Sequence, residues 1–114
     1  MSEARLPAGL EASALVRRVQ NEGGFATVIA KGHPEAGTIM ALTTCNNANF
    51  RAWERMPQAD GERRWTCVRE AENGSDPDWM AWLERRAAQD SDLWIIELDI
   101  ADGERFIPAG PLKG

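Results

Sequence analysis

The sequence predicts a single α+β domain in which an antiparallel meander sheet packs against two helices. Three observations predict this class. Two segments carry apolar residues at helical spacing, several runs rich in β-branched and aromatic residues lie between and after them, and the turns between consecutive runs are short. A chain of 114 residues suffices for one domain with its own core. We expect residues 1–107 to form the domain and residues 108–114 to form a flexible tail.

The first helix is predicted from four apolar residues that share one helical face. They are Ala12, Leu15, Val16 and Val19. We expect the helix to begin between Leu10 and Ser13, with Ser13 as its cap, and to end at Gly23-Gly24. A short strand over residues 5–10 could precede it, although proline and glycine in that stretch disfavour a strand.

Five β runs are predicted from residue composition and turn chemistry. They are Phe25 to Lys31, Gly37 to Cys45, Phe50 to Met56, Arg64 to Arg69 and Leu93 to Ile100. The first is apolar on both faces, which predicts a central strand. The next three are separated by an asparagine-rich turn over residues 46–49 and an Asp-Gly turn, which predicts the meander. An Asp102-Gly103 turn after the last run predicts a short return through Arg105 to Ile107.

The second helix is predicted to begin at Asp76, because aspartate is a good cap and Pro77 suits the first helical position. Its apolar stripe comprises Trp79, Trp82, Leu83 and Ala87, and it should end near Gln89. Aromatic residues at the period of their element usually pack, so we interpret these tryptophans as core residues.

Composition and charge restrict the classes of function. Hydrophobic residues make up 43% of the chain and charged residues 27%, as in soluble globular proteins. The net charge of −5 disfavours binding to nucleic acid or to an anionic membrane surface. Charged residues interrupt the N-terminal apolar runs, so we expect no signal peptide or membrane span and a cytoplasmic location.

The two cysteines, Cys45 and Cys67, lack the spacing of a zinc or redox site. In a reducing compartment we expect two free thiols in strands. The sequence does not tell whether they lie close together. It predicts no metal site and no cofactor.

Four segments, in order, resemble a bacterial family catalogued as domain of unknown function 1491, found mainly in alphaproteobacteria. They are SALVRRV, GHPEAGTI, DGERRW and WLERRAAQDSDLWIIEL. The resemblance extends over nearly the whole chain and implies no known activity. It also implies that the position of His33 is usually an aspartate, so an imidazole is not a fixed requirement there.

The stretch KGHPEAGTI contains the only histidine, His33, with Glu35 two residues later. A carboxylate beside an imidazole could poise a general base, and a thiol could complete a small hydrolytic site. Pro34 and Gly37, however, occupy positions typical of a tight turn. We therefore interpret the segment first as a turn that connects two strands, with His33 and Glu35 as the candidate catalytic residues.

A second candidate site lies on the third β run. Strand alternation places Arg51, Trp53 and Arg55 on one face, and Trp65 on the next strand could extend it. Aromatic rings between arginines bind single-stranded nucleic acid in some proteins, and they also form hot spots for protein partners. In soluble proteins arginine stems also commonly cover an exposed indole by cation–π contact, and the net charge of −5 favours this structural interpretation over nucleic-acid binding. The acidity does not count against a protein partner.

We therefore expect a non-catalytic module that binds a protein partner or a small ligand through Arg51, Trp53, Arg55 and Trp65. Two alternatives remain open, a small hydrolytic enzyme that uses the His33/Glu35 turn and a single-stranded nucleic-acid binder that uses the arginine face. Homodimerisation through an exposed sheet edge is a further possibility.

Overall fold

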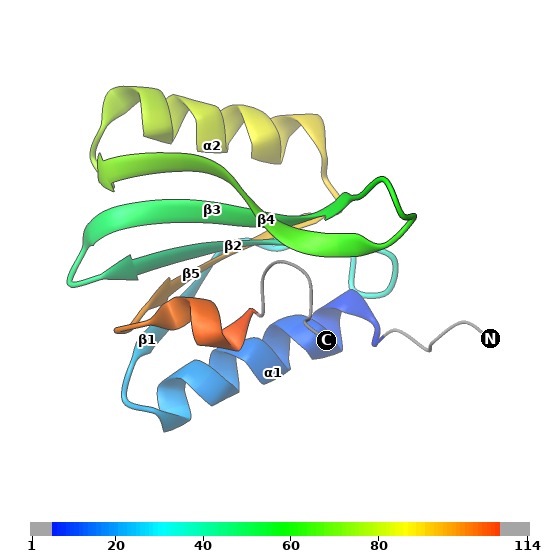
Figure 1. Ribbon diagram of the computed structural model, residues 1–114, viewed down its shortest axis with the longest axis horizontal. Helices are drawn as coiled ribbons and strands as arrows, with labels where there is room; N and C mark the ends of the chain where they lie inside the picture. The colour runs from blue at the N-terminus through cyan, green and yellow to red at the C-terminus, as the bar shows by residue number, and fades with distance from the viewer. Residues whose placement is uncertain (1–5, 108–114) are drawn as a thin grey trace.

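The computed structural model describes residues 6–107, which form two α-helices, five strands and one short 3₁₀ helix (Figure 1). The helices are α1 (Ala8–Asn21), α2 (Pro77–Gln89) and the 3₁₀ helix η1 (Gly103–Phe106). The strands are β1 (Phe25–Ala30), β2 (Thr38–Cys45), β3 (Ala48–Pro57), β4 (Arg63–Asn73) and β5 (Leu93–Asp99). The predicted α+β class is confirmed. The predicted tail, residues 108–114, lies outside the described residues.

The strands form one sheet in the order β1-β5-β2-β3-β4. β2, β3 and β4 pair as consecutive antiparallel neighbours, which is the predicted meander. β5 lies between β1 and β2, antiparallel to the first and parallel to the second, so the sheet is mixed. The parallel pair is possible because β3, β4 and α2 together supply the long connection that two parallel strands need.

β1 is an edge strand, and the prediction of a central strand at this position is wrong. Within residues 6–107 it pairs with β5 alone, and Phe25, Val28 and Ile29 are exposed. β5 lies inside β1, next to the middle strand β2, and it is buried from Leu93 to Leu98 except at Glu97. The residue pattern favoured the wrong strand, because β1 has no charged residue whereas β5 carries Glu97 and Asp99.

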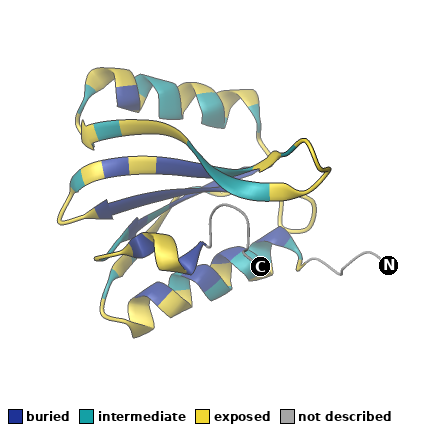
Figure 2. Ribbon diagram, viewed as in Figure 1, coloured by how far each residue is buried: buried dark blue, intermediate teal, exposed yellow. Residues whose placement is uncertain are grey.

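The sheet separates two apolar layers, one against α1 and η1 and the other against α2 (Figures 1 and 2). On the α1 side, Trp94, Ile96 and Leu98 of β5 share one face, as their alternation predicts. On the α2 side, Trp79 is buried and its ring centroid lies 5.7 Å from that of Trp82. The predicted stripe of α2 therefore packs as core.

The two helices begin in different ways. In α2 the carboxylate of Asp76 accepts hydrogen bonds from the backbone N–H groups of Asp78 at 2.8 Å and Trp79 at 3.4 Å, as predicted. α1 begins at Ala8, so the predicted strand over residues 5–10 is wrong at residues 8–10, and Ser13 lies inside the helix without capping it. α1 has no side-chain cap of its own.

The connections follow the turn chemistry of the sequence in most places. Asn46 and Asn47 have φ angles of 55° and 62°, and Cys45 pairs with Ala48 across this two-residue turn. The turn at Asp102 leads into η1 and not into the predicted return over residues 105–107.

The prediction for the cysteines is confirmed, because both are free thiols at strand positions, Cys45 exposed in β2 and Cys67 half-buried in β4. Within residues 6–107, no helix has the length and apolar character needed to cross a membrane.

Candidate functional site

The segment around His33 is a tight turn that packs against the loop between α2 and β5. The His33 amide donates to the carbonyl of Asp92 at 3.2 Å, and the His33 carbonyl accepts from Gly37 at 3.2 Å and from the indole Nε1 of Trp94 at 2.9 Å. A Cβ atom at Gly32 or Gly37 would lie 2.2 or 2.3 Å from the Asp92 oxygen. Both positions therefore require glycine, because two backbones meet there.

The imidazole of His33 takes part in the same turn. Its Nδ1 accepts hydrogen bonds from the backbone N–H groups of Glu35 at 3.1 Å and Ala36 at 3.0 Å. An aspartate side chain accepts the same two donors in an Asx turn. An aspartate in place of His33 could therefore close the turn through the same two hydrogen bonds.

The turn also caps the first helix. The carbonyl of Pro34 accepts from the amide of Gly9 at 2.7 Å, and the carbonyl of Glu35 accepts from the amide of Ala8 at 3.3 Å. The first N–H groups of a helix have no partner within the helix and need one elsewhere. A segment more than 20 residues further along the chain therefore supplies what a serine cap would supply.

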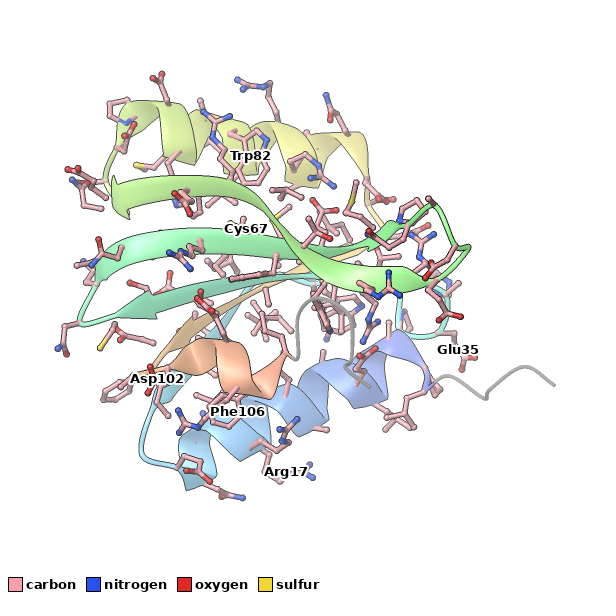
Figure 3. The ribbon with its side chains drawn as sticks, viewed as in Figure 1. Arg17, Glu35, Cys67, Trp82, Asp102 and Phe106 are labelled. Atoms are coloured by element: carbon pink, nitrogen blue, oxygen red, sulfur yellow. The ribbon has the colours of Figure 1, made fainter. Side chains whose placement is uncertain are left out.

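The hydrogen bonds of this turn argue against His33 and Glu35 as an acid/base pair. Because Nδ1 accepts two N–H groups, the neutral ring carries its proton on Nε2 and has no free lone pair for a base. Glu35 is exposed at the end of the molecule beside the start of α1 (Figure 3). Cys45 lies at the far end of β2, and eight strand residues span roughly 26 Å. The turn and this thiol are not brought together.

The second candidate, on β3, has the predicted alternation. Arg51, Trp53 and Arg55 all face α1 and η1, as their contacts show. Trp53, however, is only 7% exposed, and its indole N–H donates to the Thr43 hydroxyl at 3.0 Å. A nucleobase could stack on this ring only if the core layer that buries it, which includes residues of α1 and η1, rearranged. The sequence could not show this, because alternation identifies a shared face and not what covers it.

Acidic side chains neutralise both arginines of this face. They are Glu70 and Glu104 beside Arg51, at 3.3 and 3.0 Å, and Glu11 beside Arg55. The guanidinium of Arg55 also lies 4.5 Å from the ring centroid of Trp65, so these two predicted binding residues are brought together. Ion pairs of these two arginines thus link β3 to α1, β4 and η1.

A third surface was not predicted from the sequence. Phe25, Val28 and Ile29 of β1 are 74%, 43% and 47% exposed and lie on the open edge of the sheet. A groove of about 300 Å³ lies between α1 and β1, and Val28 is the one of these three residues that lines it. The lack of any charged residue in FATVIA was the available signal, but the same feature is typical of a buried strand.

Acidic residues near this edge do not form a metal site. Within the part of the chain that the structure describes, no group of three or more His, Cys, Asp and Glu side chains could hold a metal ion.

Glu97 lies on β5 opposite Thr27 of β1. Burial raises the pKa of the Glu97 carboxyl, and the nearby charge of Asp99 raises it further. The carboxylate of Asp90 accepts a hydrogen bond from the amide of Asp92 at 3.0 Å, which forms an Asx turn.

The chain is thus a small α+β protein with a mixed five-stranded sheet between helices and an open β1 edge. A model of a family described as "Protein of unknown function (DUF1491)" matches residues 6–108. The chain belongs to this family, and the resemblance inferred from the sequence is confirmed.

Solved structures of similar proteins agree with this assignment to the family and have a similar fold. An NMR structure of a DUF1491 family protein from Caulobacter crescentus is 30% identical, covers 98% of this chain and 100% of that chain, and has a TM-score of 0.76. A crystal structure of a DUF1491 family protein from the same organism is 31% identical, with coverages of 92% and 97% and a TM-score of 0.76. A solution structure from A. tumefaciens is 29% identical, with coverages of 96% and 100% and a TM-score of 0.75. Among curated proteins, none matches the chain.

Proposed function

We propose that this protein is a non-catalytic interaction module that binds another polypeptide through the edge of β1. One observation carries the proposal. Three large apolar side chains, those of Phe25, Val28 and Ile29, are exposed on a strand whose outer edge has no neighbour within residues 6–107. Such an edge is a template for adding a further strand from another chain.

The composition of β1 supports this use. Proteins usually protect an exposed edge with lysine, proline or inward-pointing charges, and none of the six residues of β1 is charged or proline. The one protective feature is an irregularity in pairing between Val28 and Ala30. Residues 25–28 before it pair regularly with β5.

A photo-crosslinking experiment in the native host tests the proposal. A photoreactive residue replaces Ile29 in one variant and Met80 in another, because Met80 lies on α2 with the same type of exposure, 48% against 47%. We expect a discrete crosslinked product from position 29 and none from position 80. The product should decrease when Val28→Lys is added, since a charge there removes the apolar contact.

Either of two results would overturn the proposal. If position 29 gives no discrete product, or if positions 29 and 80 give the same products, β1 is not a binding edge. Circular dichroism of each purified variant shows whether the fold is retained.

A further inference from the structure

The groove beside β1 has the form of a site for side chains of an added strand. It is bordered on one side by α1 from Ala12 to Gln20 and on the other by Val28, with Val16 and Trp94 as further apolar lining. At about 300 Å³ it lies at the lower limit of volumes that hold small molecules. Its size and apolar lining suit a few side chains better than a cofactor.

We propose that the groove and the β1 edge together bind an extended segment of a partner polypeptide, with apolar side chains at alternate positions and a carboxylate opposite Arg17. This inference rests on the function proposed above and names the chemistry of the partner.

The pairing of β1 places the groove on the correct face. Val28 pairs with Ile96, and Ile96 packs in the core layer on the α1 side. Paired strand residues point to the same face, so Val28 also points toward α1. Every second side chain of a strand added outside β1 would point the same way and enter the groove.

The dimensions of the helix and strand agree. Helix residues rise 1.5 Å each, so α1 from Ala12 to Gln20 extends about 12 Å. Strand residues rise about 3.3 Å, so this length accommodates about four residues of an extended segment. The regularly paired part of β1, residues 25–28, has the same length.

Charge selects the partner. Arg17 is the only charged residue that lines the groove, and among the described residues no ion pair engages it. It projects from the outer side of α1 (Figure 3). In a protein of net charge −5 this isolated guanidinium is complementary to a carboxylate. A second copy paired through β1 offers no acidic residue within that strand, so it would leave Arg17 without a counter-charge.

Peptide titration followed by NMR tests the inference. The probes are blocked hexapeptides of alternating valine and threonine that carry aspartate, asparagine or lysine at one outer position. We expect the aspartate peptide to shift the amide signals of β1 and the indole N–H signal of Trp94, and to bind more tightly than the lysine peptide. The difference should decrease at high salt.

Charge reversal on α1 gives the matched comparison. Arg17→Glu should weaken the aspartate peptide about two- to fivefold, the range for an exposed ion pair, and should reverse the preference for aspartate over lysine. Arg85→Glu, at an exposed position of α2, makes the same change of charge away from the groove and should leave binding unchanged.

Three results would overturn the inference. The first is that no peptide at millimolar concentration shifts the NMR signals of β1 or of the Trp94 indole. The second is that Arg17→Glu and Arg85→Glu change peptide affinity equally. The third is that self-association protects the β1 amides without any peptide. In each case a crosslinked product from position 29 would still support β1 as a binding edge, so failure of this inference can be distinguished from failure of the proposed function.

Discussion

The Nδ1 atom of His33 accepts the backbone N–H of Ala36 at 3.0 Å. The only imidazole of the chain is therefore a hydrogen-bond acceptor that closes a turn. Because carbonyls of the same turn accept the amides of Ala8 and Gly9, this contact also supports the start of α1. Sequence reasoning identified the turn correctly, and the structure adds that the turn serves as a helix cap.

The first prediction compares two substitutions at this position. His33→Asp keeps an acceptor for the amides of Glu35 and Ala36, so the free energy of unfolding should change by less than about 0.5 kcal/mol. His33→Ala removes the acceptor and should cost about 1 kcal/mol, as loss of a helix cap does. Urea denaturation of the three proteins measures both values. Equal losses for aspartate and alanine would show that the acceptor is not what histidine contributes.

The part of this turn that could be predicted is local. Pro34 and Gly37 indicate a turn through their own backbone preferences, and Asp76 indicates a helix start in the same way. The contact between Pro34 and Gly9 joins segments far apart in sequence, and no pattern within either segment specifies it. For this reason the start of α2 was predicted correctly and that of α1 was not.

The same distinction applies to the candidate sites. Alternation correctly placed Arg51, Trp53 and Arg55 on one face, because side-chain direction in a strand is a local property. Whether that face is covered depends on where α1 packs, and whether β1 is central depends on where β5 inserts. Trp53→Ala is consequently unsuitable as a test of binding, since loss of a buried tryptophan costs about 3–5 kcal/mol of stability.

The second prediction concerns the close contact at Gly32. Gly32→Ala would place a methyl group 2.2 Å from the Asp92 carbonyl oxygen, so the turn must separate from the loop before β5. We expect a loss of more than about 3 kcal/mol or failure to fold, measured by denaturation and by the soluble fraction.

Gly61→Ala is the matched control for Gly32→Ala. Gly61 has a φ of 88°, and a Cβ added there would meet no atom within 4 Å, so alanine at this position meets backbone strain alone. The expected cost is about 1–2 kcal/mol. A cost at Gly61 as large as that at Gly32 would contradict the account of close backbone packing.

The third prediction separates hydrogen bonding from packing at Trp53. Thr43→Val keeps the shape of the side chain but removes the hydroxyl that accepts the indole N–H at 3.0 Å. A buried donor without a partner costs about 1–3 kcal/mol. Thr43→Ser keeps the acceptor and loses one methyl group, at a cost of about 0.8 kcal/mol. A serine variant less stable than the valine variant would show that packing of the methyl group dominates.

The last prediction follows from the raised pKa of Glu97. Burial and the charge of Asp99 both favour the protonated carboxyl in the folded state, so its pKa there exceeds the unfolded value of about 4.3. The contribution of the protonated group to stability is complete below the unfolded pKa and is lost as pH rises through the folded pKa. Glu97→Gln should therefore be more stable than the natural protein at pH 7, by less than about 1 kcal/mol because solvent screens a half-buried group.

The pH dependence identifies the cause of any gain at Glu97. The advantage of Glu97→Gln over the natural protein should disappear below about pH 4, where the natural side chain is protonated in both states. Glu84→Gln removes the same charge from an exposed position on α2 and serves as the control. Thermal unfolding of all three proteins between about pH 3 and 8 measures the difference. A gain that persists at low pH would mean that glutamine packs better against β1, and the charge of Glu97 would then have no part in it.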